Sequence, residues 1–189
     1  AALCFIESPI SVGYSPEDRK EGGNGYVPIT LQYRPYQAME AREHSIAGGD
    51  PLEESKDRGY RGKWNRAANE ADLDLVLEMR RRMGDKPVVT IVSLKNPMVM
   101  AELEPYTDAL LVEYGVSPQA ALDVLTGRFA PQGLLPVQLP KDMETVERQR
   151  EDVPFDMECY QDEEGHVYDF GFGMDYNGTI EDERVRRYG

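Results

Sequence analysis

The sequence has no apolar run that could cross a bilayer, and it has few cysteines and histidines. Its apolar stretches fall well short of the ~18–20 residues of a membrane-spanning helix. Cys4 and Cys159 are too few for a disulfide scaffold, and the apolar run around Cys4 favours a buried free thiol. His44 and His166 lie too far apart in sequence to pair as metal ligands. We therefore expect no transmembrane helix, no metal site and no cofactor.

Basic residues are also scarce, with 21 Lys and Arg against 35 Asp and Glu and a net charge of −14. This excess of acids disfavours binding to nucleic acid or to an anionic membrane, because phosphates need Lys and Arg to neutralise them. Ten acids and three bases fall within residues 141–165, so half of the excess lies there. We interpret the stretch from residue 141 as an acidic C-terminal extension whose charges form a solvated face.

The motifs of several large enzyme classes are missing. No G-x-G-x-x-G follows a predicted strand and no Walker A loop occurs, which disfavours dinucleotide and nucleotide binding. Residues 22–25, Gly-Gly-Asn-Gly, would offer backbone donors to an anion, but a turn explains them better. Residues 169–171 repeat a kinase tripeptide without the other kinase motifs, and no G-x-S-x-G elbow marks a nucleophilic serine.

The length of 189 residues fits one domain and is too short for a (β/α)₈ barrel, which takes ~250 residues. The sequence opens inside an apolar run at residues 1–7, without a Met or a signal peptide. We therefore expect residues 1–189 to be a single domain from a larger protein, whose compartment this stretch does not reveal.

Strand and helix patterns alternate along much of the chain. Apolar runs at residues 1–7, 87–94 and 108–112 predict buried strands. Residues 134–139 predict a final short strand, whose proline suggests a sheet edge or a strand end. Helices are predicted over residues 70–83, 98–104 and 118–125, which follow Asn69, Asn96-Pro97 and Ser117 as capping signals. The alternation predicts a three-layer α/β/α sandwich around a mostly parallel, doubly wound sheet of about six strands.

Residues 8–68 interrupt this pattern, and we call them the excursion. They show no clear periodicity and are far longer than a median loop of ~4–6 residues. Disordered segments are usually poor in aromatics, whereas the excursion holds five tyrosines and Trp64, so we expect it to be ordered. It leaves the carboxyl end of the first predicted strand, where open parallel sheets bind ligands. We therefore expect the excursion to shape a site.

The excursion is rich in acids that could act in catalysis, although any single one of them is more often a solvated surface group. These acids are Glu17, Asp18, Glu21, Glu40, Glu43, Asp50, Glu53, Glu54 and Asp57.

The second half of the chain carries an ordered set of motifs. They are Lys-Pro-Val-Val-Thr-Ile-Val at residues 86–92, Asn-Pro-Met-Val-Met at 96–100, the strand at 108–112, Ala-Leu-Asp-Val-Leu-Thr-Gly at 121–127, Pro-Gln-Gly-Leu-Leu-Pro-Val at 131–137 with Leu-Pro at 139–140, and Tyr-Asp-Phe-Gly-Phe-Gly-Met at 168–174. Together they resemble the C-terminal α/β-sandwich domain of glycoside hydrolase family 3, chiefly its β-glucosidase-like members.

This resemblance implies a retaining, exo-acting β-glycosidase that hydrolyses a β-linked glycoside. In this family an N-terminal (β/α)₈ barrel supplies the Asp nucleophile, and that barrel is absent here. The sandwich domain closes the active site, and in several members one of its loops supplies the general acid/base Glu. The barrel of the same enzyme would then be the partner of this chain, and the chain alone would be inactive. Family members are often secreted or periplasmic.

The resemblance also nominates residues for the site. Glu17 is our first choice for the acid/base, because the family often has an acid shortly before an Asp-Arg pair, and Glu21 is our second. Asp18, Arg19 and Trp64 are expected to bind the substrate. Residues 114–119 lack the acid that many members carry after the third strand.

Two other interpretations remain open at this point. In the first, the chain is a non-catalytic α/β interdomain or carbohydrate-binding module, and the excursion is only a docking surface. In the second, it is a stand-alone regulatory α/β domain.

Overall fold

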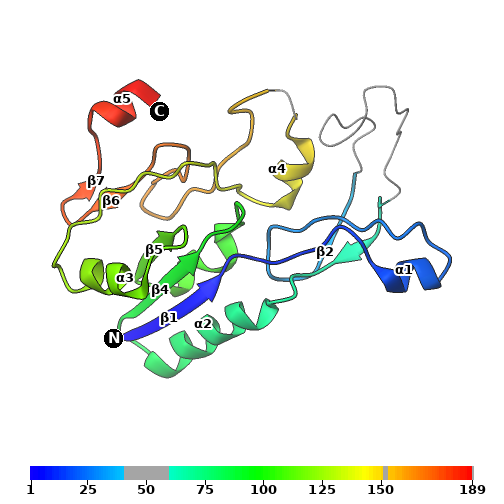
Figure 1. Cartoon of the computed structure of the whole chain (residues 1–189), viewed down its shortest axis with the longest axis horizontal. Coiled ribbons are helices and arrows are strands. Elements are labelled where there is room, and N and C mark those ends of the chain that lie inside the picture. Colours follow the sequence, from blue (N-terminus) through cyan, green and yellow to red (C-terminus); the bar gives the residue numbers. More distant parts are fainter. Residues whose placement is uncertain (41–59, 151–152, 189) are drawn as a thin grey trace.

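The computed structural model describes residues 1–40, 60–150 and 153–188. At its centre lies a parallel sheet of three strands in the order β1 (Ala2–Glu7), β4 (Val88–Ser93) and β5 (Ala109–Glu113), shown in Figure 1. β4 is the middle strand and pairs in parallel with both neighbours. Its Val88–Ser93 stretch is almost wholly buried, as its β-branched run predicts.

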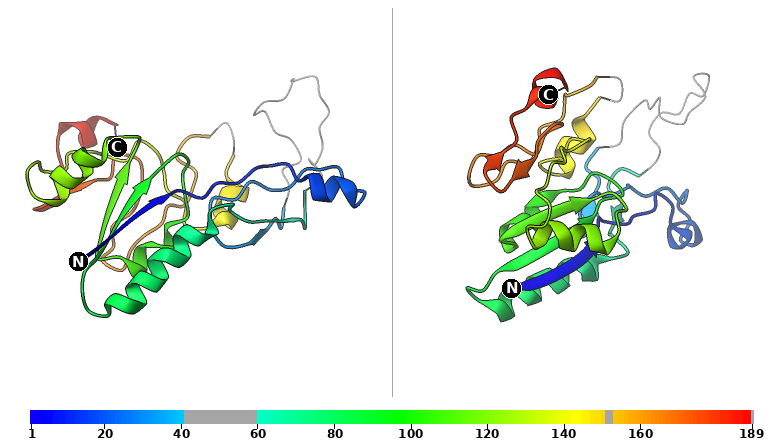
Figure 2. Two further views of the ribbon diagram at one scale, coloured as in Figure 1. Left: turned by 60° about the horizontal axis from the view of Figure 1, so that its bottom comes forward. Right: turned by 60° about the vertical axis from the view of Figure 1, so that its left-hand side comes forward.

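Helix α2 (Glu70–Met83) packs against β1 and β4 (Figure 2). Its Leu73 and Val76 are buried in one core with Cys4, Ile6 and Val92 of the strands. Three arginines lie in the last turn of α2, where the helix dipole favours cations, and Gly84 follows the helix with a positive φ of 56°. The helix predicted over residues 70–83 and the buried free thiol of Cys4 are both confirmed.

The described sheet has three strands, so the sheet of about six strands is not found among the residues described. The strand predicted at residues 134–139 is wrong. This stretch runs alongside residues 168–172 through isolated bonds, from the N–H of Leu135 to the Phe172 carbonyl at 2.7 Å and from the N–H of Leu139 to the Tyr168 carbonyl at 3.0 Å. Pro136 has no N–H to donate, which limits any regular ladder there.

The helix predicted over residues 98–104 is also wrong, because that stretch forms two short 3₁₀ turns, η1 (Met100–Glu102) and η2 (Glu104–Tyr106). Pro105 accounts for the break, because the residue before a proline is disfavoured in the α conformation. By contrast, α3 (Pro118–Leu125) begins as predicted. The Ser117 side chain accepts a hydrogen bond from the N–H of Ala120.

Three short helices and one two-stranded hairpin of the described chain lie outside the central sheet, α2 and α3. α1 (Pro16–Lys20) belongs to the excursion, α4 (Met143–Arg148) to the acidic extension, and α5 (Glu183–Tyr188) to the C-terminal end. β6 (Met174–Asp175) and β7 (Gly178–Thr179) form an antiparallel hairpin. The acidic extension is not only a solvated face, since its Met143 and Tyr160 are buried.

The described part of the excursion lies beyond the carboxyl end of β1, where Figure 1 shows α1 set apart from the sheet. Its two-stranded antiparallel sheet pairs β2 (Tyr36–Gln37) with β3 (Trp64–Asn65). Tyr33 fastens the excursion to the sheet, because its ring is fully buried and its hydroxyl donates to the Glu7 carbonyl at 2.5 Å. The described part of the excursion is therefore ordered, as its aromatic content predicts.

Candidate functional site

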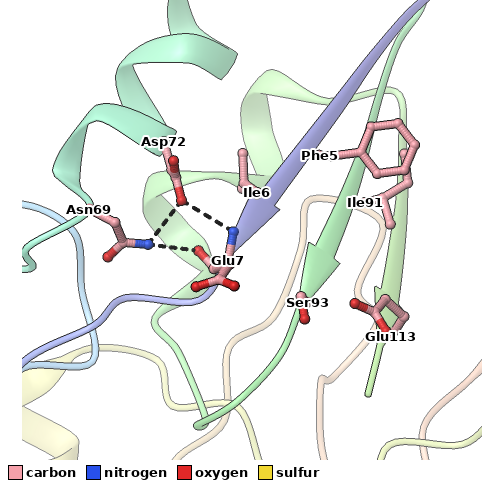
Figure 3. A pocket seen from close by; sticks show the side chains of 8 residues that line it. All are labelled: Phe5, Ile6, Glu7, Asn69, Asp72, Ile91, Ser93 and Glu113. Atoms are coloured by element: carbon pink, nitrogen blue, oxygen red, sulfur yellow. Dashed lines mark hydrogen bonds between the residues drawn. The ribbon is translucent and has the colours of Figure 1, made fainter. Parts of the chain in front are cut away.

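Two hollows lie near the carboxyl end of β1. The larger one has a volume of about 540 Å³, and we call it the excursion pocket. Its lining comes mainly from residues 10–17 and 64–71, and it includes Glu17, Trp64 and Tyr14. The smaller one has a volume of about 450 Å³ and lies at the sheet end, so we call it the sheet-end pocket (Figure 3).

Glu17 reaches the excursion pocket from the first turn of α1. Ser15 starts this helix, since its Oγ accepts a hydrogen bond from the N–H of Asp18 at 3.2 Å, and Pro16 occupies the first helical position. The same Ser15 hydroxyl donates to Glu17 Oε2 at 3.3 Å. Glu17 is exposed and lines the pocket, where the Ser15 hydroxyl orients its carboxylate.

Trp64 reaches the same pocket from β3. Its side chain is 60% exposed, which is unusual for a tryptophan and leaves its ring able to stack on a sugar. The next residue, Asn65, fixes this strand to the segments before and after α1. Its Nδ2 donates to the carbonyl of Pro28 at 2.7 Å and to the carbonyl of Val12 at 3.0 Å.

Tyr14 adds a second aromatic ring to the pocket, and its side chain is 51% exposed. Tyr14 forms an antiparallel bridge with Tyr26. Its ring lies so close to Gly25 that a Cβ there would come within 2.4 Å of it, and Gly25 has a positive φ of 86°. Both observations require glycine at this position, so the place of the Tyr14 ring depends on it.

The Asp18 side chain is 21% exposed and forms an ion pair. Its Oδ2 lies 2.7 Å from Lys63 Nζ and accepts the N–H of Gly25 at 2.8 Å. The hydrogen bonds from Lys63 and from Gly25 hold the pKa of Asp18 below its usual value. This carboxylate is thus ionised and engaged within the chain, next to the residue predicted as the acid/base.

The acidic extension supports the other side of the excursion. Glu147 of α4 accepts hydrogen bonds from the hydroxyl of Tyr36 in β2 and, at 3.1 Å, from the N–H of Glu40. The N–H of Leu31 donates to Met143 Sδ at 3.2 Å. Because β2 pairs with β3, these contacts also support the strand that carries Trp64.

The sheet-end pocket holds three carboxylates that bind groups of the chain itself. Glu7 pairs with Lys95 at 2.7 Å. Asp72 accepts hydrogen bonds from the N–H of Glu7 at 3.2 Å and from Nδ2 of Asn69 at 2.9 Å, as Figure 3 shows. Burial opposes ionisation of Glu113. Hydrogen bonds from the Ser93 hydroxyl and from the N–H groups of Val116 and Gly115 nevertheless hold the pKa of Glu113 below its usual value. These carboxylates therefore organise the sheet edge.

The structure brings together two of the five residues nominated from the sequence, Glu17 and Trp64, in one pocket. Asp18 follows Glu17 but is paired with Lys63, and Arg19 donates to the Asn24 carbonyl at 3.5 Å. Glu21 is exposed directly after α1.

Of the other acids considered in the excursion, only Glu40 lies within the described residues. Its N–H donates to Glu147. The remaining acids and His44 lie outside the described residues; these acids are Glu43, Asp50, Glu53, Glu54 and Asp57.

Sequence reasoning missed Lys63, Asn65 and Glu147, which fix the excursion pocket. Each of them binds residues that are distant in the sequence, and no local spacing pattern predicts such contacts. In the part of the chain that the structure describes, no group of three or more His, Cys, Asp and Glu side chains could hold a metal ion. No described helix has the length and apolar character needed to cross a membrane.

Residues 45–176 match the family described as "Glycosyl hydrolase family 3 C-terminal domain". Among curated proteins, "Beta-glucosidase C" of Emericella nidulans is 38% identical over 90 residues, which are 48% of this chain and 14% of that protein. "Probable beta-glucosidase C" of Aspergillus flavus is 39% identical over 90 residues, 48% of this chain and 13% of that protein.

A more distant relative is bacterial. "Periplasmic beta-glucosidase/beta-xylosidase" of Dickeya chrysanthemi is 27% identical over 94 residues, which cover 50% of this chain and 14% of that protein. No solved structure matches the chain. The matched part of this chain thus corresponds to about a seventh of the length of these relatives.

Proposed function

Since this chain belongs to the family of glycosyl hydrolase family 3 C-terminal domains and is related to β-glucosidases, we propose that it completes the active site of a retaining, exo-acting β-glycosidase. An N-terminal (β/α)₈ barrel of the same enzyme would supply the Asp nucleophile and would bind the β-linked glycoside together with this domain. The small share of the relatives that the chain covers supports a role within a larger enzyme.

The observation that carries this proposal is the excursion pocket, where a carboxylate and two exposed aromatic rings meet beyond the end of a parallel strand. Glu17 would protonate the oxygen of the leaving group and then take a proton from the attacking water. Retaining hydrolysis needs this residue within ~5–5.5 Å of the nucleophile, which the barrel would bring to the pocket. Trp64 would stack on the substrate, and Arg19 would lie beside it.

The parallel sheet also supports a place for this domain within a larger enzyme. β1 lies at an edge of the described sheet, and on one of its faces Leu3 and Phe5 are 44% and 52% exposed. Parallel sheets are normally covered on both faces, and an open apolar edge strand is prone to aggregation. Further strands from the larger enzyme would pair with β1 and complete a sheet of about six strands within an α/β/α sandwich.

The test compares the isolated chain with the enzyme in which it is joined to its barrel, using an aryl β-glucoside as substrate. The isolated chain is expected to be inactive, since it holds one of the two carboxylates. In the joined enzyme, Glu17→Ala should slow turnover by about 10²–10⁴-fold, which is the usual contribution of general acid–base catalysis. Added azide should restore part of the rate, because it attacks the glycosyl-enzyme without help from a base.

Glu163→Ala is the matched control, since Glu163 is an exposed glutamate of the acidic extension. It should turn over at the rate of the unmodified enzyme. Hydrolysis by the isolated chain would contradict the proposal. Full activity of Glu17→Ala would remove Glu17 from the mechanism, and the same substitution at Glu21 would then be tested.

The two exposed aromatic rings also favour a second candidate, a carbohydrate-binding module without a catalytic residue. Trp64 is the only tryptophan, so its fluorescence reports directly on the pocket. Saturable quenching or enhancement by a β-glucoside, combined with unchanged turnover in both Glu17→Ala and Glu21→Ala, would favour this second function.

A further inference from the structure

We propose that Lys63 is a positioning residue that holds the loop bearing Glu17 against the strand bearing Trp64. The inference rests on the proposed role of Glu17 as the acid/base. Lys63 would not touch the substrate. It would act through Asp18, which is the neighbour of Glu17 in the chain.

The contacts of the Lys63 ammonium converge on one turn. Nζ lies 2.7 Å from Asp18 Oδ2 and 2.8 Å from Asn24 Oδ1. The same Asp18 oxygen accepts the N–H of Gly25 at 2.8 Å, and Asn24 Oδ1 accepts the N–H of Tyr26 at 3.0 Å. The Lys63 ammonium therefore binds both side chains, Asp18 and Asn24, that fix the turn from α1 to Tyr26.

The ion pair joins two parts of the chain that are 45 residues apart. Lys63 directly precedes Trp64, and Asp18 directly follows Glu17. The backbone of Lys63 is itself fixed, because its carbonyl accepts the N–H of the buried Ala38 at 3.1 Å. The pair thus links the acid and the aromatic ring of the excursion pocket through adjacent residues.

The space around Asp18 allows it little freedom. A Cβ at Gly23 would lie 2.1 Å from Asp18 Oδ2, so the glycine leaves room for the carboxylate only in this place. The N–H of Gly23 also donates to the Asp18 carbonyl at 2.8 Å. A shift of Asp18 would therefore move the first turn of α1, and Glu17 with it.

A second lysine offers a matched control. Lys141 pairs with Glu158 at 2.7 Å, the same distance as in the Lys63–Asp18 pair. The Lys141 and Glu158 side chains are 52% and 64% exposed, whereas the Lys63 and Asp18 side chains are only 23% and 21% exposed. Exposed ion pairs contribute little to structure, so removing the charge of Lys141 should change nothing at the site.

The experiment measures kcat and KM of the barrel-joined enzyme on an aryl β-glucoside for Lys63→Met, Lys63→Arg and Lys141→Met. We expect Lys63→Met to lower kcat by about 10–100-fold, because a misplacement of about 1 Å can cost that much. Lys63→Arg keeps the charge and should recover most of the rate, while Lys141→Met should match the unmodified enzyme. Thermal unfolding of each variant reports separately on folding.

The double variant Glu17→Ala/Lys63→Met decides whether Lys63 acts through Glu17. If it does, the double variant is no slower than Glu17→Ala alone. Losses that multiply in the double variant, or full activity of Lys63→Met beside a slow Glu17→Ala, would overturn the inference while the proposed function stands. Full activity of Glu17→Ala would overturn both the inference and the role of Glu17.

Discussion

The parallel sheet and the excursion are held in place by different forces. β1, β4 and α2 enclose an apolar core in which Cys4, Val76 and Val92 are almost fully buried. The described excursion keeps Tyr14, Trp64 and Ile29 more than half exposed, and its turns are fixed mainly by side chains that bind distant backbone groups.

The contrast shows how a segment without periodicity becomes ordered. Burial stabilises the sheet in proportion to the apolar area removed from water, so many residues share the task. In the excursion, single polar groups such as Asn65 and Asp18 carry several contacts each, and Glu102 of η1 likewise binds two N–H groups of the excursion. Losing one such group should loosen a whole turn, while the exposed aromatic rings remain free to bind a ligand.

The largest effect is expected in the core between α2 and the sheet. Leu73→Ala should lower the free energy of unfolding by about 2–5 kcal/mol, because it removes a buried side chain and leaves a cavity in the core. Leu75→Ala is the control on the same helix, since Leu75 is 46% exposed. Urea unfolding of the two variants measures the difference, and equal losses would contradict the placement of the core.

The next effect concerns Glu102, which ties the excursion to the core. Its carboxylate accepts the N–H of Tyr33 at 2.6 Å and the N–H of Arg34 at 3.1 Å. Glu102→Ala leaves both donors without this acceptor, so we expect a loss of about 2–4 kcal/mol in urea unfolding. Glu181→Ala, at an exposed glutamate, should cost less than about 0.5 kcal/mol. If Glu102→Ala left the free energy of unfolding unchanged, water would be replacing the carboxylate as acceptor, and the prediction would be contradicted.

A local effect is expected at Asn65. Asn65→Asp keeps the shape of the side chain but replaces the Nδ2 donor that binds the carbonyls of Val12 and Pro28. The global stability should fall by only about 1 kcal/mol, while amide hydrogen exchange accelerates in residues 10–30 and stays unchanged in β4. Uniform acceleration in both segments would mean that the excursion and the sheet unfold as one unit.

The smallest effect depends on pH. The hydrogen bonds from Lys63 and Gly25 lower the pKa of Asp18 in the folded protein. The ion pair therefore contributes its full share to the free energy of unfolding at pH values above the unfolded pKa of about 3.9. It is lost as the pH falls through the lower folded pKa. Trp64 fluorescence, titrated from pH 6 to 2, should therefore change with a midpoint below about 3.9. Lys63→Met should move this midpoint upward, and an unmoved midpoint would contradict the coupling.

The sequence predicts the sheet better than the excursion. The apolar runs of β1, β4 and β5 and the capping signals of α2 and α3 are local, and all five elements form as predicted. Pro105 and Pro136 mark the two places where the prediction is wrong, since both interrupt a pattern that otherwise looks regular. The number of strands in a sheet depends on pairing between distant segments, which local patterns do not contain.

For the site, aromatic content predicts that the excursion is ordered, and Glu17 and Trp64 do line one pocket. Their catalytic and binding roles remain predictions. The residues that hold them, Lys63, Asn65 and Glu147, could not be found from the sequence, because the contacts by which they do so span between 37 and 111 residues of the chain.

Acid catalysis by Glu17 is tested most directly by changing the leaving group. In the barrel-joined enzyme, kcat/KM of Glu17→Ala is compared with that of the unmodified enzyme on phenyl and dinitrophenyl β-glucosides. A phenolate leaves only with help from an acid, so its glucoside should lose about 10²–10⁴-fold, whereas the dinitrophenyl glucoside should lose far less. Equal losses on both substrates would contradict the assignment of Glu17 as the general acid.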